Sequence, residues 1–114
     1  MIDAAGRSVL PGFIEAHMHV FGGGAILNDL LLTGTKGKTA IREKVRAHAA
    51  ANPEAKVLFC QGADYDMLDG SPIDRYFLDS ILDDRPLAFV AFDHHTMWAN
   101  TILLEEVRLL HGKA

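Results

Sequence analysis

The nine residues PGFIEAHMH (11–19) constrain the fold of this chain more than any other part of its sequence. After the Pro-Gly pair the side chains alternate strictly: one set is entirely apolar, and the other set ends in His17 and His19. A period of two is typical of a β-strand with one buried face. Glycines occupy positions 22–24, so a loop is expected to follow. We therefore predict a strand over residues 13–20 whose carboxyl end carries two histidines, and parallel α/β proteins build their active sites at such ends.

The spacing of His17 and His19 suits a metal ion. Residues two apart on one strand project side by side, about 6.5 Å apart at Cα. Two imidazoles at this spacing can coordinate one ion, with nitrogens at about 2.0–2.1 Å if the ion is zinc. Stable sites usually have three or four protein ligands, so the pair alone would bind zinc weakly. A simpler interpretation stays open, in which the two histidines only pack or form hydrogen bonds on a β face.

The rest of the chain alternates between strand and helix patterns. Short apolar runs bounded by turn residues predict two buried strands, at 56–61 and 87–93. Apolar spacing and capping residues predict helices at 25–32, from Thr39 to the Asn52-Pro53 pair, from Ser71 to Leu82, and from Asn100 or Thr101 to Leu110. This order predicts an α/β fold of parallel strands joined by right-handed crossovers, with helices on the faces of the sheet.

Length and composition set limits on the whole protein. With 114 residues the chain is long enough for one domain but too short for a (β/α)8 barrel, which needs about 250 residues. The net charge is −4 and the basic residues are scattered, so a nucleic-acid partner is not expected. Cys60 is the only cysteine, which excludes an internal disulfide and a cysteine-based zinc site. The sequence has neither a secretory signal nor an apolar run of about 20 residues, so we expect a soluble cytoplasmic protein without a membrane partner.

A second polar group, DHHTMWAN at residues 93–100, follows the last predicted strand. If the strand continued through it, Asp93 and His95 would share one face and His94 would take the other. Asp93 and His95 can then line a site at the edge of the sheet, or they can simply hydrogen-bond locally. Trp98 can be a substrate platform or, more often for such a residue, a packing anchor.

These motifs resemble those of a known family. PGFIEAHMH, with DAAGRSVL (residues 3–10) before it, resembles the start of the first barrel strand in the amidohydrolase superfamily of metal-dependent hydrolases. DHHTMWAN resembles the Asp-x-His-x-x-Trp-x-Asn element of amidohydrolase family 3, the branch of N-substituted formamide deformylase-like enzymes. The resemblance also includes Gly62-Ala63-Asp64 and Arg85-Pro86, so it extends over nearly the whole chain.

The resemblance implies that residues 1–12 are a short β segment and that residues 13–114 are part of a (β/α)8 barrel, incomplete in this chain. It implies that His17 and His19 bind a catalytic divalent metal ion, with zinc the expected ion. The remaining ligands of the family, and the aspartate that takes a proton from the metal-bound water, cannot be placed in this sequence. The substrate-binding residues that the resemblance implies are His95, Asp93 and Trp98.

The implied function is that of a segment of a metal-dependent amidohydrolase. Such an enzyme hydrolyses a non-peptide C–N bond, in an amide, formamide or cyclic amide, of a small-molecule substrate. We expect the fragment alone to be inactive because ligands are missing. The alternative is a non-catalytic α/β module, from a truncated gene, that serves metal binding or assembly. In either case a three-stranded parallel sheet has open edges with unpaired backbone groups, so we expect a homo-oligomer or pairing with the remainder of the parent protein.

Overall fold

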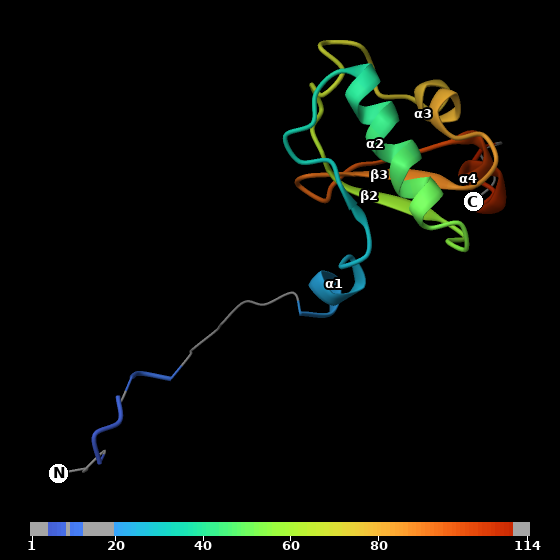
Figure 1. Cartoon of the computed structure of the whole chain (residues 1–114). Helices are drawn as coiled ribbons and strands as arrows, with labels where there is room; N and C mark the ends of the chain where they lie inside the picture. The colour runs from blue at the N-terminus through green and yellow to red at the C-terminus, as the bar shows by residue number, and fades with distance from the viewer. Residues whose placement is uncertain (1–4, 9, 13–19, 111–114) are drawn as a thin grey trace.

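The computed structural model describes residues 5–8, 10–12 and 20–110. Within them, helices alternate with strands up to β3, which is followed directly by β4 (Figure 1). The elements are α1 (Val20–Ala25), β1 (Leu30–Leu31), α2 (Lys38–Ala51), β2 (Leu58–Ala63), α3 (Arg75–Ile81), β3 (Leu87–Ala91), β4 (Met97–Ala99) and α4 (Thr101–Glu106). The strand predicted over residues 13–20, with His17 and His19, lies outside the described residues except for Val20, which begins α1.

The four strands form one sheet in the order β1-β2-β3-β4. The first three strands are parallel, and Cys60 of β2 lies between Leu30 of β1 and Phe89 of β3. β4 is antiparallel to β3, with Trp98 opposite Phe89. The prediction of an α/β fold is therefore confirmed, and the sheet is mostly parallel, with the antiparallel β4 as an addition that the sequence did not predict.

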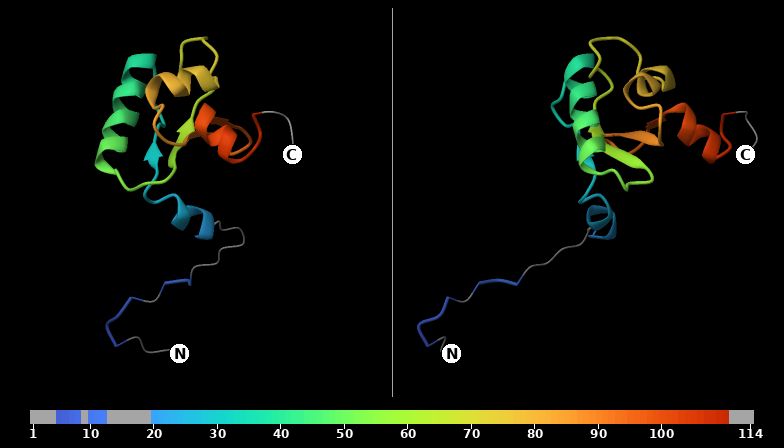
Figure 2. Two further views of the ribbon diagram at one scale, coloured as in Figure 1. Left: turned by 90° about the vertical axis from the view of Figure 1, so that its right-hand side faces the viewer. Right: turned by 45° about the vertical axis from the view of Figure 1, so that its right-hand side comes forward.

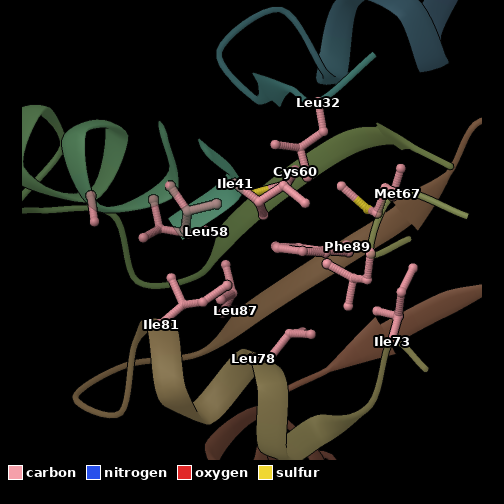
Figure 3. Close-up of a cluster of buried hydrophobic side chains, with 14 residues drawn as sticks. Leu32, Ile41, Leu58, Cys60, Met67, Ile73, Leu78, Ile81, Leu87 and Phe89 are labelled. Carbon is pink, nitrogen blue, oxygen red and sulfur yellow. The ribbon is translucent and has the colours of Figure 1, made fainter. Parts of the chain in front are cut away.

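The hydrophobic core lies between the sheet and helices α2 and α3 (Figure 3). The strands direct alternate apolar side chains towards these helices, and each helix contributes one apolar face. α1 lies apart from this body, clear of α2 and α3 (Figure 2). The largest fully buried apolar side chains are those of Phe89, Leu32, Ile41, Leu58, Met67, Leu78 and Leu87.

α2 forms as the sequence predicts. Its buried stripe has the expected spacing of four residues. The stripe consists of Ile41, Val45 and Ala49. The helix ends before Pro53, and its last carbonyl groups accept hydrogen bonds from the Arg85 guanidinium, at 2.9 Å from the carbonyl oxygens of both Ala49 and Asn52. Among the described residues, no helix has both the length and the apolar character needed to cross a membrane.

The prediction of a helix over residues 25–32 is wrong. α1 ends where that segment begins, and the segment instead contains β1. Leu32 is almost wholly buried in the core, and Leu30 packs against it. Asp29, just before β1, accepts a hydrogen bond from Gln61 Nε2 of β2 at 2.7 Å. Pairing with β2 therefore outweighs the local helix propensity of this stretch.

The predicted start of α3 at Ser71 is also wrong. The N-cap is Asp74, whose carboxylate accepts a hydrogen bond from the N–H of Phe77 at 2.8 Å. Ser71 belongs to the preceding turn, where its own N–H donates to the carbonyl of Leu68. Both residues are good N-caps, and starting the helix at the later one leaves Ile73 in an extended segment that reaches the core.

The strand predicted over residues 87–93 ends early, at Ala91. The chain then reverses and returns as β4, and the N–H of Ala91 donates to the carbonyl of Thr96 at 2.9 Å across the turn. Antiparallel pairing with β4 gives hydrogen-bond partners to the backbone groups of β3 on the side away from β2. A longer single strand would leave these groups unpaired. Asp93 and His95 therefore lie in a turn and do not share a strand face, contrary to the prediction.

Candidate functional site

β2 and β3 are parallel, so their carboxyl ends meet at the same edge of the sheet. Tyr65 lies just after β2, and the β3–β4 turn follows β3. The N–H of Phe92 donates to the carbonyl of Ala63 at 3.0 Å, which holds the turn against the end of β2. Asp93 and His95 both lie in this turn, at the edge where open α/β sheets bind their ligands.

Tyr65 is the centre of a polar and aromatic cluster at this edge. Its hydroxyl forms hydrogen bonds with Thr96 Oγ1 at 2.7 Å and with the two carboxylate oxygens of Asp93 at 3.2 and 3.3 Å. Its ring meets Trp98 edge to face with the ring centroids 5.3 Å apart, and Phe92 with the centroids 6.1 Å apart. Tyr65 therefore links Asp93 to Trp98, although neither is its neighbour in sequence.

The carboxylate of Asp93 is stabilised in its charged form. Its Oδ1 accepts a hydrogen bond from the backbone N–H of His95 at 3.0 Å, and this bond is the main reason why the pKa of Asp93 lies below its usual range. The hydrogen bond from Tyr65 and the charge of His95 lower the pKa further, while local desolvation opposes them. Asp93 is thus an ionised acceptor for a hydrogen bond within its own turn. Local hydrogen bonding was one of the two alternatives that the sequence allowed for this residue.

Trp98 and Asn100 make structural contacts. Trp98 is half-buried and packs against the hydrophobic core as well as against Tyr65. Asn100 is completely buried and is the N-cap of α4. The structure thus places Asp93 and His95 in one turn and links Asp93 to Trp98 through Tyr65.

Sequence reasoning missed Tyr65 and His94. Tyr65 lies in an acidic stretch typical of a solvated loop, and only its position directly after a buried strand points to this site. Strand periodicity would direct His94 away from Asp93, whereas in the turn this residue borders a cavity of about 430 Å³. The described residues lining that cavity are Gly22, Gly23, Ile26 and His94.

Metal ligands are sparse in the described part of the chain. Among residues 5–8, 10–12 and 20–110, no three or more His, Cys, Asp or Glu side chains are close enough together to hold a metal ion. Burial, helped by the charge of Asp29, raises the pKa of the Cys60 thiol to about 12, so this buried sulfur stays protonated. The predicted ligands His17 and His19 lie outside the described residues.

Two proteins from other organisms are similar in sequence to this chain. Exoenzymes regulatory protein AepA of Pectobacterium carotovorum subsp. carotovorum is 29% identical over 112 residues, which cover 91% of this chain and 23% of AepA. Protein LONG AFTER FAR-RED 3 of Arabidopsis thaliana is 24% identical over 104 residues, which cover 91% of this chain and 18% of that protein.

A solved structure and a family model extend these similarities. The crystal structure of an uncharacterized metal-dependent hydrolase from Pyrococcus horikoshii OT3 matches with a TM-score of 0.65 and 26% identity, over 86% of this chain and 19% of that chain. The chain therefore spans about a fifth of the length of these relatives. The Amidohydro_3 model, described as amidohydrolase family, matches residues 1–114, a range that contains both the histidine pair and the β3–β4 turn. By this match over its whole length, the chain belongs to the amidohydrolase family.

Proposed function

We propose that this chain is an early β/α portion of a (β/α)8 barrel in a metal-dependent hydrolase that cleaves a non-peptide C–N bond. The observation that carries the proposal is the amidohydrolase family match over residues 1–114. The metal-dependent hydrolase from Pyrococcus horikoshii, similar in fold over most of this chain, supports it. In this proposal residues 1–12 form a short β segment before the barrel, and residues 13–114 form its first units. The substrate is an amide, formamide or cyclic amide, as in the N-substituted formamide deformylase-like branch.

His17 and His19 would hold a divalent metal ion, with zinc the expected one. A bound ion of this kind acidifies a water molecule and polarises the scissile carbonyl group. The described residues provide no complete ligand set, so the other ligands and the proton acceptor would come from outside this chain. We therefore expect the 114 residues alone to bind metal weakly and to lack hydrolase activity.

On the substrate side, the proposal uses the cluster at the carboxyl edge of β2 and β3. The ionised Asp93 fixes the β3–β4 turn through the N–H of His95, and this leaves the exposed His95 imidazole available to a substrate. Trp98 and Tyr65 offer an aromatic wall beside it. Asp93, His95 and Trp98 are therefore proposed as substrate-site residues, with Tyr65 positioning Asp93.

Metal binding by the histidine pair is tested with the full chain and zinc alone. Isothermal titration calorimetry of the wild type should give one weak zinc site per chain. His17→Ala and His19→Ala should each abolish it, because a single imidazole cannot hold the ion. His48→Ala, which removes a histidine on α2 that hydrogen-bonds Asn52, is the matched control and should keep the site. Zinc binding that survives both substitutions in the pair would contradict the ligand assignment.

The second candidate function is a non-catalytic module for metal binding or assembly. It is favoured by the name of one relative, which describes AepA as a regulatory protein and not as an enzyme. The two candidates differ in the polypeptide that contains this chain. Metal-dependent hydrolysis of an N-substituted formamide or amide by that polypeptide, lost with His17→Ala, would support the enzyme. Zinc binding without any hydrolysis over a panel of such substrates would support the module.

A further inference from the structure

Tyr65 and Phe92 form an exposed aromatic corner at the carboxyl edge of β2 and β3. Tyr65 is 46% exposed and Phe92 is 59% exposed, so both large rings contact the solvent. Their planes meet at 84°, with the centroids 6.1 Å apart. Trp98 packs against the core and meets Tyr65 edge to face, which holds the Tyr65 ring in place. Two rings held at nearly a right angle can direct their faces towards one shared position, as in the aromatic cages that bind cations.

The carboxylate of Asp93 lies beside this aromatic corner. Asp93 follows Phe92 in the chain, and its two oxygens lie 3.2 and 3.3 Å from the Tyr65 hydroxyl. Its described partners are that hydroxyl and the N–H of His95, whereas an ionised carboxylate has about four acceptor positions. These contacts also keep the pKa of Asp93 low, so the charge is present at neutral pH. Because Asp93 is only partly buried, it can accept a further hydrogen bond from a ligand.

The aromatic corner and the carboxylate favour the same kind of ligand. The face of an aromatic ring attracts a positive charge within about 6 Å of its centroid. A carboxylate attracts the same charge and repels an anion. The chain already contains one contact of this type on α3, where the Arg75 guanidinium lies 4.6 Å from the centroid of the Tyr76 ring. Among organic cations, a primary ammonium suits Asp93 best because its N–H groups also donate charge-assisted hydrogen bonds.

We infer that Tyr65, Phe92 and Asp93 form a binding site for a primary alkylammonium group. The ammonium donates a hydrogen bond to Asp93, and the adjoining CH₂ groups contact the two rings. This site goes beyond the proposed function, which assigns the substrate no charge, and it rests on that function only in taking the ligand to be a substrate. A substrate of the parent enzyme then carries an amine in addition to the bond that is cleaved.

An NMR titration of the isotope-labelled full chain with n-butylammonium chloride tests this site. Trp98 is the only tryptophan, so its indole N–H gives a single signal next to Tyr65. Saturable shifts are expected for this signal and for the backbone N–H groups of Phe92 and His95. 1-Butanol has the same hydrocarbon chain without the charge, and it should give no saturable shifts at the same concentrations. Sodium chloride, which matches the ionic strength, should give none either.

Asp93→Asn separates the charge from the shape of the site. Its amide oxygen can still accept the hydrogen bond from His95, but the negative charge is lost, so binding of n-butylammonium should weaken about fivefold. Asp83→Asn is the matched control, because it removes an equal charge from an exposed position before β3, and it should bind as the wild type does. Circular dichroism shows whether each variant is folded under the conditions of the titration.

Phe92→Ala tests the aromatic wall at an exposed position, where the substitution leaves the core intact. It should weaken binding about threefold, because one of the two ring faces is lost. Tyr76→Ala is its control: it also removes an exposed ring, but one whose face Arg75 already covers, and it should leave the affinity unchanged.

Three results would overturn the assignment of this site. They are the absence of saturable shifts at the Trp98 indole with n-butylammonium, equal shifts with 1-butanol, and an affinity that neither Asp93→Asn nor Phe92→Ala reduces. The titration contains no metal and measures no turnover, so a negative result leaves the proposed hydrolase function untouched. Conversely, a parent protein that binds the ammonium but hydrolyses no amide would keep this site and lose only the proposed reaction.

Discussion

Asn100 connects three parts of the fold through its buried side chain. Its Oδ1 accepts hydrogen bonds from the N–H groups of Leu87 at 3.0 Å and Leu103 at 3.1 Å. Its Nδ2 donates to the carbonyl groups of Leu82 at 3.1 Å and Arg85 at 2.8 Å. One side chain thus provides hydrogen-bond partners for backbone groups at the start of β3, in the first turn of α4 and in the loop after α3. The Asn of the DHHTMWAN motif is explained by folding alone.

We expect Asn100→Ala to destabilise the chain by about 3 kcal/mol, because several buried backbone groups lose their partners at once. Urea denaturation followed by circular dichroism measures the change. Asn28→Ala, in the exposed turn after α1, is the control and should change the free energy of unfolding by less than about 0.5 kcal/mol. A loss as small for Asn100 as for Asn28 would show that the buried network contributes little.

The charge of Asp93 makes the stability of the turn depend on pH. The pKa of Asp93 is lower in the folded chain than in the unfolded chain, where it is about 3.9. The carboxylate therefore stabilises the fold fully at pH values above the unfolded pKa. This contribution is lost as the pH falls through the folded pKa. Asp93→Asn should therefore be less stable than wild type at about pH 7, and the difference should shrink below about pH 4. Urea denaturation over this range tests it. The control is Asp83→Asn, which removes a carboxylate from the exposed turn before β3; equal trends in the two variants would contradict the prediction.

At the scale of single elements, α3 offers a direct choice between two capping residues. The sequence favours Ser71, and the structure uses Asp74. Asp74→Ala should cost about 1 kcal/mol of stability because the N–H of Phe77 loses its acceptor. Ser71→Ala should have almost no effect. Thermal or urea unfolding of both variants decides, and a larger loss for Ser71→Ala would place the helix start where the sequence pattern put it.

The elements that the sequence predicts correctly are those whose signals are local. The buried stripe of α2 and its end before Pro53 follow from spacing and from proline sterics. The apolar runs of β2 and β3 likewise identify strands covered by helices. β1 and β4 are two and three residues long, and they exist because a neighbouring strand pairs with them, so no local pattern identifies them.

In the candidate site, too, local signals are predictable from the sequence and tertiary contacts are not. Asp93 and His95 are predictable because a polar group directly follows an apolar strand. Tyr65 is 28 residues before Asp93 in the sequence, and only the parallel pairing of β2 with β3 brings the two together. The position of His94 depends on the reversal of the chain after Ala91, which strand periodicity does not reveal. Residue types are therefore predictable here, whereas their partners depend on the tertiary fold.

At the scale of the whole molecule, the sheet is covered unequally on its two faces. α2 and α3 cover one face, while the other leaves an apolar groove of about 370 Å³ between the strands and α4. The groove is lined by Phe59, Met97, Ala99, Leu103, Leu104, Val107 and Leu109. Met97 of the edge strand β4 is 55% exposed and Leu109 is 56% exposed, so apolar surface and open backbone groups occur together.

This combination gives the expected self-association a definite location. We predict that the chain associates with a second copy through β4 and the adjoining groove, since burying Met97 and its neighbours removes apolar area from water. In sedimentation velocity the average mass should exceed that of a monomer and rise with concentration. Met97→Lys should shift the chain towards monomer, because a charge at the edge strand opposes pairing. Tyr76→Lys, an equally drastic change at an exposed aromatic residue of α3, should leave the association unchanged. A constant monomer mass at all concentrations would exclude β4 as a pairing edge, and an equal effect of both substitutions would place the contact elsewhere on the molecule.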